Sequence, residues 1–340
     1  MLKITTPDDW HVHLREGETL SHTVPATAFH FGRALVMPNL TTPLTSVEAI
    51  ERYRTQIIKH IPTPLFTPYF TLFLNHNVSA KTLQIAKKTH FILGAKLYPQ
   101  HATTHSSHGA KSIKALYPLI EVMQQEDLVL QIHGELPNVD IFDRETSFIH
   151  TTLPSLMADF PHLRIVLEHI STETAVRFIE NTSENIAATI TPHHLFYNRN
   201  DLLSGGIRPH RYCLPIIKRA TDQKALCQAA TSGNPKFFAG TDSAPHPIKN
   251  KESDCGCAGI YSAPYVVALY ADIFERYHAL ERLDAFMGHF GAQFYRLPRN
   301  KSRLTLIRNP QRIPTNLPLG NQTVVPMQAG ETLNWSVLDE

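Results

Sequence analysis

The stretch Leu128-Val129-Leu130-Gln131-Ile132-His133-Gly134 is an apolar run of strand length that ends in a histidine and a glycine. Similar short runs alternate with helix-like stretches along the chain, a pattern typical of repeated strand and helix units with a parallel sheet. We predict eight strands, at residues 9–14, 33–38, 65–74, 91–97, 128–133, 163–169, 186–190 and 236–240. Eight such units predict a closed (β/α)8 barrel of the α/β class.

The segments between these strands predict helices, a few long loops and one terminal extension. Helices are expected at residues 47–59, 112–125, 172–180 and 222–231, most of which begin at or near Ser, Thr or Asp. Connections 98–111 and 191–220 are long for this architecture, and such loops are usually functional or disordered. The Pro- and Asn-rich chain after Leu297 predicts an irregular extension. We therefore predict a single catalytic domain over residues 1–340, with the irregular extension beginning at about residue 297.

The composition favours a soluble protein that acts on a small molecule. Hydrophobic residues make up 42% of the 340 positions, which is enough for a large core. The formal charge is only +2, so the chain has no electrostatic footprint for nucleic acid. We find no apolar targeting segment at the N-terminus and no uncharged run of roughly 18 residues that would cross a membrane. We expect a cytoplasmic protein with no nucleic-acid or membrane partner.

Cysteine and histidine usage differ sharply. The four cysteines are too few and too unevenly spaced for a disulfide framework, so we expect Cys213, Cys227, Cys255 and Cys257 to be reduced. The pair Cys255 and Cys257 is one residue closer than a usual metal-binding pair, and we interpret it as two thiols in a Gly-rich loop. Histidine, by contrast, occurs 20 times, which indicates a use for imidazole.

The segment His11-Val12-His13 would place both imidazoles on one face of a strand. With this histidine content, chance alone gives about one such spacing, so the motif by itself is weak. Its position at the end of a predicted strand strengthens it.

Polar residues also follow other apolar runs, and strand ends of a barrel open on the face where active sites lie. The convergent set would be His11, His13, Lys96, His133, His169 and Asp242. Each histidine alone is also compatible with a hydrogen-bonded core or surface position, but their joint placement favours a site. Four imidazoles and one carboxylate suit Zn²⁺ or a similar ion, and they exceed what one tetrahedral ion needs, which implies two ions. Lys96 would repel cations as an ammonium with a pKa of about 10.4, so it is either chemically altered or a lysine outside the ligand shell.

The chain resembles the shorter, monofunctional, bacterial-type (class II) dihydroorotases of the amidohydrolase superfamily over roughly residues 8–264. The matching motifs are WHVHLR at 10–15, VMPNL at 36–40, AKLYP at 95–99, HGE at 133–135 with DIFDRE at 140–145, EHI at 168–170, TITP at 189–192, GGIRPH at 205–210 and GTDSAPH at 240–246. So many motifs in one order make the resemblance highly specific.

The resemblance implies a reversible reaction between (S)-dihydroorotate and N-carbamoyl-L-aspartate in de novo pyrimidine (UMP) biosynthesis. It implies two Zn²⁺ per subunit, bridged by a hydroxide and by Lys96 carrying a carboxylate from CO₂ (N6-carboxylysine). His11, His13 and Asp242 would hold one ion, and His133 and His169 the other. The bridging hydroxide would attack the ring amide, and Asp242 would act as general base and then general acid.

By the same resemblance, the substrate is bound by Arg15, Asn39 and His246 and by backbone groups of Leu214 and Ala258. The guanidinium fork of Arg15 suits a carboxylate. Arg15 is also compatible with a surface salt bridge, and Asn39 with a turn. The loop 98–111 is interpreted as a lid whose Thr103 and Thr104 reach the substrate, the alternative being an exposed connection.

Two histidines depart from the family pattern, and two other functions compete with this one. His105 stands where we expect Asn, and His193 stands where we expect Gln. One alternative is another cyclic-amide hydrolase such as a hydantoinase, which Arg15, Asn39 and His246 argue against. The other is a catalytically inactive homologue that serves as a structural subunit, which would be expected to have lost ligands. The resemblance also implies a homodimer.

Overall fold

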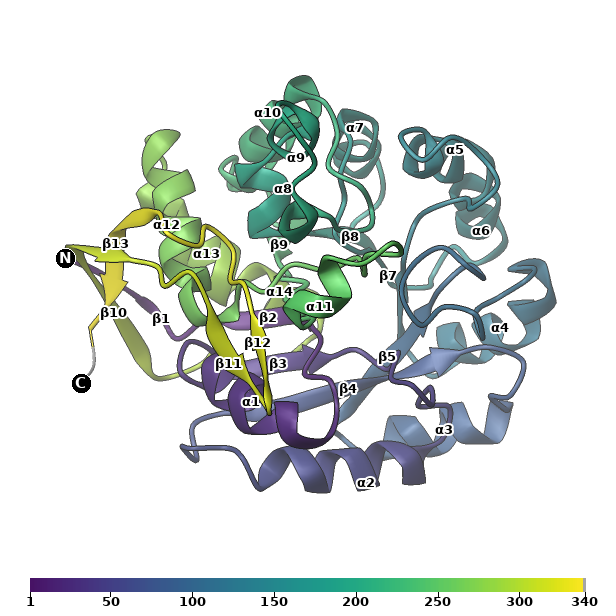
Figure 1. Cartoon of the computed structure of the whole chain (residues 1–340). Coiled ribbons are helices and arrows are strands. Elements are labelled where there is room, and N and C mark those ends of the chain that lie inside the picture. Colours follow the sequence, from purple (N-terminus) through teal and green to yellow (C-terminus); the bar gives the residue numbers. More distant parts are fainter. Residues whose placement is uncertain (339–340) are drawn as a thin grey trace.

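The computed structural model describes residues 1–338, and its centre is a parallel barrel (Figure 1). The barrel strands are β2 (Asp8–Val12), β3 (Arg33–Val36), β4 (Thr67–Leu74), β5 (Ile92–Leu97), β6 (Val129–Ile132), β7 (Ile165–Leu167), β8 (Ile186–Ile190) and β9 (Phe237–Ala239), paired in sequence order. The residues after β9 close the ring on β2, since Asp242 N donates to His11 O at 2.8 Å and Val12 forms a parallel bridge with Ser243. The eight predicted strands and the (β/α)8 barrel are confirmed.

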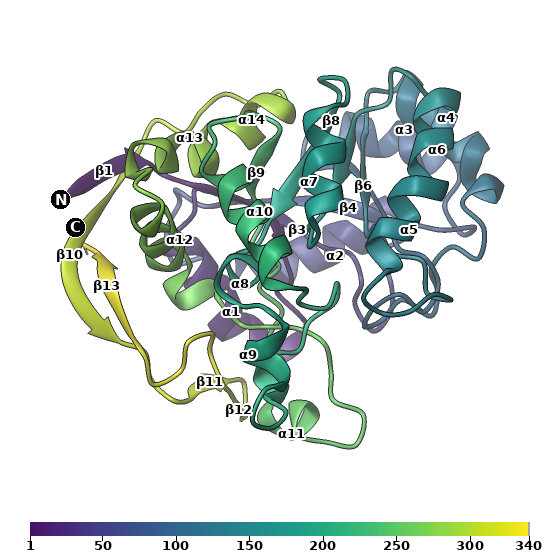
Figure 2. The ribbon, with the colours of Figure 1, turned by 90° about the horizontal axis from the view of Figure 1, so that it is seen from above.

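Helices surround the barrel, as the view from above shows (Figure 2). The α-helices are α1 (Leu20–Ala28), α2 (Val47–Ile58), α3 (Ala80–Lys88), α4 (Tyr117–Gln125), α5 (Arg144–Thr151), α6 (Leu153–Asp159), α7 (Glu173–Glu180), α8 (Pro192–Phe196), α9 (Arg199–Leu203), α10 (Ala220–Ala230), α11 (Ile248–Lys251), α12 (Val266–Arg276), α13 (Leu283–Gly288) and α14 (Phe290–Phe294). Short 3-10 helices lie at Gly17–Thr19, Lys114–Leu116, Pro209–Arg211, Ala263–Tyr265 and Leu280–Arg282. The four predicted helices are confirmed, although the one expected from residue 112 begins as a 3-10 turn before α4.

Alternation along the strands divides the core and positions the site. Outward residues such as Leu130 and Ile132 join the large apolar cluster between barrel and helices, whereas Val129 joins a smaller cluster with Trp10 inside the barrel. Because side chains alternate, the inward row that starts at Val129 continues through Gln131 to His133. The same alternation carries Lys96 of β5 to the inside. The inward side chains of β6 thus begin among packed core residues and lead to a candidate site residue, His133.

The prediction of an irregular C-terminal extension is wrong. Strand β10 (Arg303–Arg312) pairs antiparallel with β1 (Leu2–Thr5) and β13 (Thr332–Val337), and β11 (Leu317–Leu319) pairs with β12 (Gln322–Val324). Asn309-Pro310, within the stretch whose Pro- and Asn-rich composition led to this prediction, lies at a register shift in β10, where a strand tolerates proline. Leu306 and Trp335 of this sheet join the main core. The single-domain boundary of 1–340 stays a prediction, and its last two residues lie outside the described part of the chain.

The two long connections contain local structure. The segment 191–220 holds α8, α9 and a 3-10 helix, and the loop 98–111 is fixed by a parallel bridge between Pro99 and Ala110. Within residues 1–338, no helix combines the length and the apolar character needed to cross a bilayer.

Candidate metal centre and catalytic pocket

The carboxyl ends of the barrel strands bring five of the six predicted ligands together in one cavity, and the sixth, Lys96, is buried and does not line it. Its lining includes His11, His13, His133, His169 and Asp242, together with Arg15, Asn39, Tyr98, Thr103, Thr104, Leu214, Ala244, Ala258 and Gly259. These side chains come from distant parts of the sequence, so their convergence is a property of the fold.

The imidazoles are arranged in two close pairs. His11 Nε2 lies 3.3 Å from His13 Nε2, and His133 Nδ1 lies 3.3 Å from His169 Nε2. Asp242 Oδ1 lies 2.9 Å from His13 Nε2 and 3.4 Å from His11 Nε2. Two nitrogen ligands of one tetrahedral Zn²⁺, each at about 2.0–2.1 Å from the ion, would be about 3.3–3.4 Å apart. Both pairs therefore have the spacing of ligands that share an ion, and the donor set fits two ions.

Lys96 is buried close to Glu168 and Asp242, and its Nζ lies over the ring of Tyr98, 5.2 Å from the centroid. Its side chain is fully buried, and Nζ has no hydrogen-bond partner. Burial lowers the pKa of Lys96 to about 8, against the opposing effect of Glu168 and Asp242. A buried ammonium without a partner is costly, so this position favours a neutral or modified amine.

The electrostatics of the cluster favour the metal-binding forms of the ligands. Burial lowers the pKa of His13 to about 4 and holds the pKa of His169 well below its usual range. These imidazoles are therefore neutral near pH 7 and offer lone pairs. Burial alone would raise the pKa of Asp242, but the hydrogen bond with His13 and the neighbouring charges of His11 and His13 hold it well below its ordinary value. Asp242 is thus an ionised carboxylate.

Two supporting carboxylates were not among the predicted site residues. Glu168 Oε2 lies 2.9 Å from His11 Nδ1 and accepts a hydrogen bond from Thr189 Oγ1 at 2.6 Å. Glu135 Oε2 lies 2.7 Å from His133 Nε2. Carboxylates in this position fix the tautomer and orientation of a metal-binding imidazole. For Glu135 the available signal was its position two residues after His133. Glu168 contacts His11, which is distant in sequence, so its position next to His169 did not indicate this role.

The backbone at three site residues is also unusual. Arg15, His169 and Asp242 have φ values of 64°, 40° and 44°. Side chains other than glycine rarely adopt this left-handed region, at a cost of about 1–3 kcal/mol each, and such residues cluster at functional sites. The left-handed backbone at these three positions therefore sets the direction of their side chains.

The predicted substrate-binding residues form one connected wall of the cavity. Arg15 Nη2 lies 2.9 Å from His246 Nε2, and Arg15 Nε donates to Pro245 O at 3.0 Å. His246 Nε2 also lies 3.0 Å from the carbonyl oxygen of Ala258. Asn39 and Leu214 line the same cavity. The structure therefore brings together Arg15, Asn39, Leu214, His246 and Ala258, and Arg15 is no surface salt-bridge residue.

The loop 98–111 covers this wall. Thr104 Oγ1 donates to Ala258 O at 3.3 Å, and Asn39 Nδ2 donates to Thr104 O at 3.3 Å. Thr103 lines the cavity, and its backbone is held by Ser106, whose Oγ accepts from Thr103 N at 2.9 Å. His105 is exposed and does not line the cavity.

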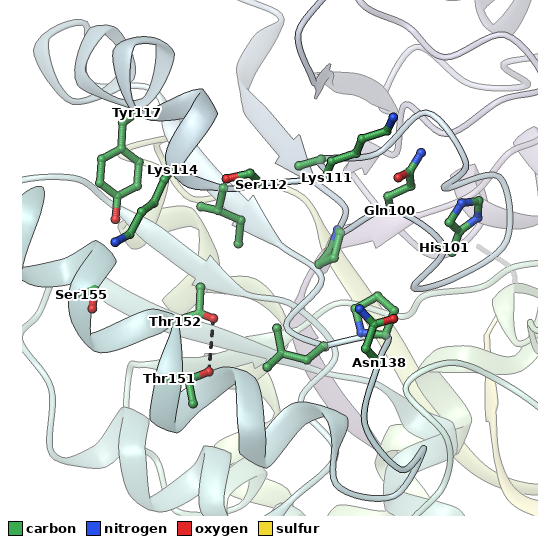
Figure 3. Close-up of a pocket in the computed structure, with 15 residues that line it drawn as sticks. Gln100, His101, Lys111, Ser112, Lys114, Tyr117, Asn138, Thr151, Thr152 and Ser155 are labelled. Carbon is green, nitrogen blue, oxygen red and sulfur yellow. Dashed lines mark hydrogen bonds between the residues drawn. The ribbon is translucent and has the colours of Figure 1, made fainter.

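A second, larger pocket of about 650 Å³ lies beside the same loop and shares no lining residue with the catalytic cavity (Figure 3). It is lined by Gln100, His101, Lys111 and Lys114, and across from them by Thr151, Thr152 and Ser155. It contains none of the predicted metal ligands, so its size does not make it the reaction site.

Comparisons with known proteins agree with this geometry. No family model matches the chain. A dihydroorotase from Coxiella burnetii is 53% identical over 342 residues, covering 99% of this chain and 98% of the relative. The structure of a Saccharomyces cerevisiae dihydroorotase in complex with 5-fluoroorotic acid superposes with a TM-score of 0.92 at 34% identity, covering 99% of both chains.

A hydantoinase from Arthrobacter aurescens gives a TM-score of 0.81 at 16% identity, covering 98% of this chain and 82% of that chain. This likeness shows the shared barrel fold alone. The long match to dihydroorotases, by contrast, covers nearly every residue of both chains at high identity. The chain therefore belongs to the dihydroorotase family of the amidohydrolase superfamily.

Proposed function

We propose that this chain interconverts (S)-dihydroorotate and N-carbamoyl-L-aspartate, a reaction of de novo pyrimidine biosynthesis. The observation that carries the proposal is the convergence of two imidazole pairs and Asp242 in a cavity that Arg15 also lines. Lys96, whose Nζ has no hydrogen-bond partner, is buried close to Glu168 and Asp242. The family relationship supports it, and the yeast relative was solved with 5-fluoroorotic acid.

Membership of this family implies a divalent-metal centre, which we propose to be two Zn²⁺ ions. His11, His13 and Asp242 would hold one ion, and His133 and His169 the other, as the ligand spacings of both groups allow. When bound, the ions supply an activated water at neutral pH and polarise the scissile carbonyl. Glu168 and Glu135 keep the imidazoles of His11 and His133 oriented.

We propose that Lys96 carries a carboxylate derived from CO₂. The neutral amine attacks the carbon of CO₂, a bond forms between Nζ and that carbon, and one proton is released to solvent. The lowered pKa makes the neutral amine accessible. The product is an anion, which replaces an unpartnered cation at a position where two cations would be held.

We propose that Asp242 moves the proton of the reaction. Its ionised carboxylate accepts a proton from the attacking water while a C–O bond forms at the ring amide carbon. It then donates this proton to the ring nitrogen as the C–N bond breaks, which completes the addition of one water. Ring closure uses the same groups in reverse.

Arg15, Asn39 and His246 would bind the carboxylate of the substrate, and the backbone of Leu214 and Ala258 would bind the polar edge of its ring. The guanidinium of Arg15 supports this role because it is already oriented by Pro245 and His246. Thr103 and Thr104 would close the cavity from the lid and exclude water, which strengthens the electrostatic contacts inside. We also propose a cytoplasmic homodimer, on the family resemblance alone.

The substrate assignment can be tested by assaying dihydroorotate and hydantoin side by side with the purified protein. We expect hydrolysis of dihydroorotate and little or no turnover of hydantoin, which lacks the carboxylate that Arg15 would bind. Turnover of hydantoin alone would replace the proposal by the hydantoinase alternative. Inactivity toward both, with the metals present, would favour the inactive structural subunit.

A further inference from the structure

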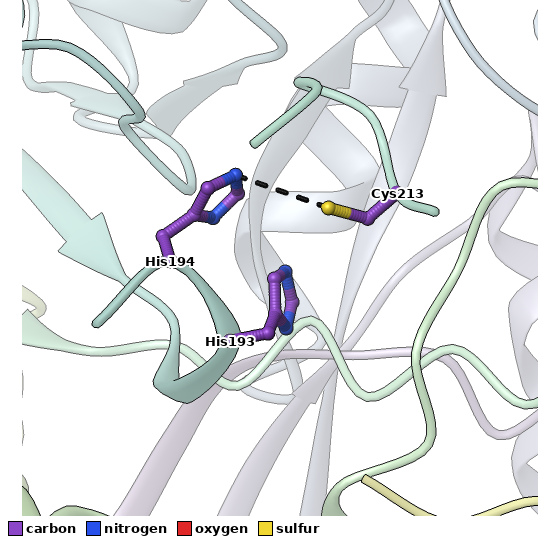
Figure 4. A group of neighbouring side chains, drawn as sticks. All are labelled: His193, His194 and Cys213. Carbon is purple, nitrogen blue, oxygen red and sulfur yellow. Dashed lines mark hydrogen bonds between the residues drawn. The ribbon is translucent and has the colours of Figure 1, made fainter. Parts of the chain in front are cut away.

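A second group of metal-binding side chains lies outside the catalytic cluster, at the start of α8. His193, His194 and Cys213 each offer a ligand atom, and these atoms lie within 4.8 Å of one another (Figure 4). All three side chains are buried. None of them lines the catalytic cavity. The proposed two-metal centre uses none of them, so the group needs an explanation of its own.

His193 supplies an independent sign that a ligand is expected. Its side chain is fully buried, and neither Nδ1 nor Nε2 has a hydrogen-bond partner. An unsatisfied buried polar group costs about 1–3 kcal/mol, so a histidine with two such nitrogens is a poor choice for mere packing. Figure 4 shows the His193 ring beside the Cys213 sulfur and the His194 ring. A bound ion would satisfy one of these nitrogens.

His194 is fixed by hydrogen bonds at both ring nitrogens. Its Nε2 donates to Pro215 O at 2.9 Å and lies 4.0 Å from Cys213 Sγ, and its Nδ1 lies 2.8 Å from Thr191 Oγ1, which then donates to it. To bind an ion through Nε2, the ring takes the other tautomer, in which Nδ1 donates to Thr191 Oγ1. A hydrogen bond of this kind at one ring nitrogen is the usual support for a histidine that binds a metal through the other.

A shared backbone acceptor shows that two of these groups face the same point. Pro215 O accepts hydrogen bonds from His194 Nε2 at 2.9 Å and from Cys213 Sγ at 3.4 Å. The set of two imidazoles and one thiolate suits a borderline or soft ion and leaves a fourth tetrahedral position for another ligand.

We propose that His193, His194 and Cys213 form a third metal site, which takes Zn²⁺ or a similar thiophilic divalent ion. Binding forms a bond from Cys213 Sγ to the ion, and the thiol proton leaves to solvent. Burial raises the pKa of the Cys213 thiol, so the protonated thiol is the form that precedes binding. The ion ties α8 to the segment that carries Leu214, which forms part of the catalytic cavity wall.

Cobalt titration separates this site from the two-metal centre. The proposed catalytic ligands include no thiolate, so a near-ultraviolet thiolate-to-cobalt absorption band reports the third site alone. We expect metal-stripped wild-type protein titrated with Co²⁺ to develop this band, with a final amplitude that corresponds to one thiolate-bound ion in addition to the ions of the two-metal centre. The band should be lost in Cys213→Ser and weakened in apparent affinity by roughly tenfold or more in His193→Gln.

Matched variants control for the other thiols. Cys227→Ser removes a buried thiol outside the group, and Cys255→Ser/Cys257→Ser removes an exposed and a half-exposed one. All these variants should keep the band. The proposal is overturned if wild type shows no band, if the band survives in Cys213→Ser, or if it disappears in the Cys255/Cys257 double variant. Should Cys213→Ser fail to fold, unchanged cobalt affinity in folded His193→Gln would equally overturn it. None of these outcomes depends on hydrolysis of dihydroorotate.

Discussion

The two ends of the barrel differ in how their buried charged groups are paired. At the amino end, Arg33 Nε and Nη2 donate to the two carboxylate oxygens of Asp8 at 2.8 and 2.6 Å, and Asn300 Nδ2 adds a third bond to Asp8. At the carboxyl end, imidazoles face one another at 3.3 Å and Lys96 Nζ has no hydrogen-bond partner.

This difference separates residues that stabilise the fold from residues that perform chemistry. A stable interior requires that buried charges be paired. Unpaired buried charges are retained only where function requires them. In this architecture, the carboxyl face carries catalysis and the amino face carries stability. The comparison predicts that substitutions at the two ends will have different consequences.

The largest effect is expected for Lys96→Ala at the carboxyl end. The variant should lose all measurable activity and bind less metal, because the bridging anion is gone. Metal analysis and a hydrolysis assay check this, and an added short carboxylic acid should restore part of the activity. Full activity with two metals per chain would eliminate the bridging carboxylysine.

Asp242→Asn should reduce kcat by about 10²–10⁴, the usual contribution of one general acid/base group, with a smaller effect on substrate binding. The amide can lie beside a metal but cannot carry the proton. Steady-state kinetics on the metal-loaded variant provide the measurement. If kcat stays near the wild-type value with the metals in place, another group moves the proton.

At the amino end, Arg33→Ala should lower the free energy of unfolding by about 3–5 kcal/mol, because it leaves a buried carboxylate without its cation. The folded fraction should keep the wild-type kcat. Urea unfolding combined with kinetics tests both statements. As a control, Arg177→Ala removes the exposed ion pair with Glu173 and should cost at most about 1 kcal/mol. A large loss of kcat in folded Arg33→Ala would break the distinction between the two ends.

The smallest effect is expected in the lid. Replacing Thr103 and Thr104 with Ala should lower kcat/KM at least tenfold, about 1.4 kcal/mol, without changing the fold or the metal content. The matched control replaces Thr151 and Thr152, which line the pocket of Figure 3 and lie outside the catalytic cavity, and should change little. If the lid variant turns over substrate at the wild-type rate in both reaction directions, the loop is only a connection and has no role as a lid.

The sequence was most informative where local pattern and tertiary role coincide. The barrel strands were predictable because their apolar runs are buried on both faces, and strand ends alone pointed to His133, His169 and Asp242. The pairing of His133 with His169 and the contact of Glu168 with His11 were not predictable, since they depend on distances between separate strands. Glu135 follows His133 by two residues, so its contact with that imidazole was within reach of the sequence.

Two features of the structure were not predicted from the sequence, for physical reasons. The C-terminal sheet was missed because β10 is exposed over much of its length and is interrupted at Asn309-Pro310, so it lacks the apolar run of a barrel strand. The grouping of His193, His194 and Cys213, for which we propose a metal, was not predicted because Cys213 is distant in sequence from the two histidines, and a lone cysteine carries no spacing signal.

The central claim, that the carboxyl end of the barrel is a metal-dependent dihydroorotate site, is tested most directly by one combined measurement. Bound metal and dihydroorotate hydrolysis are determined on the same preparation before chelation, after chelation and after Zn²⁺ is restored. We predict that at least two ions per chain are present, that activity falls with their removal, and that it returns with their replacement. Undiminished hydrolysis by the metal-free protein would contradict this account.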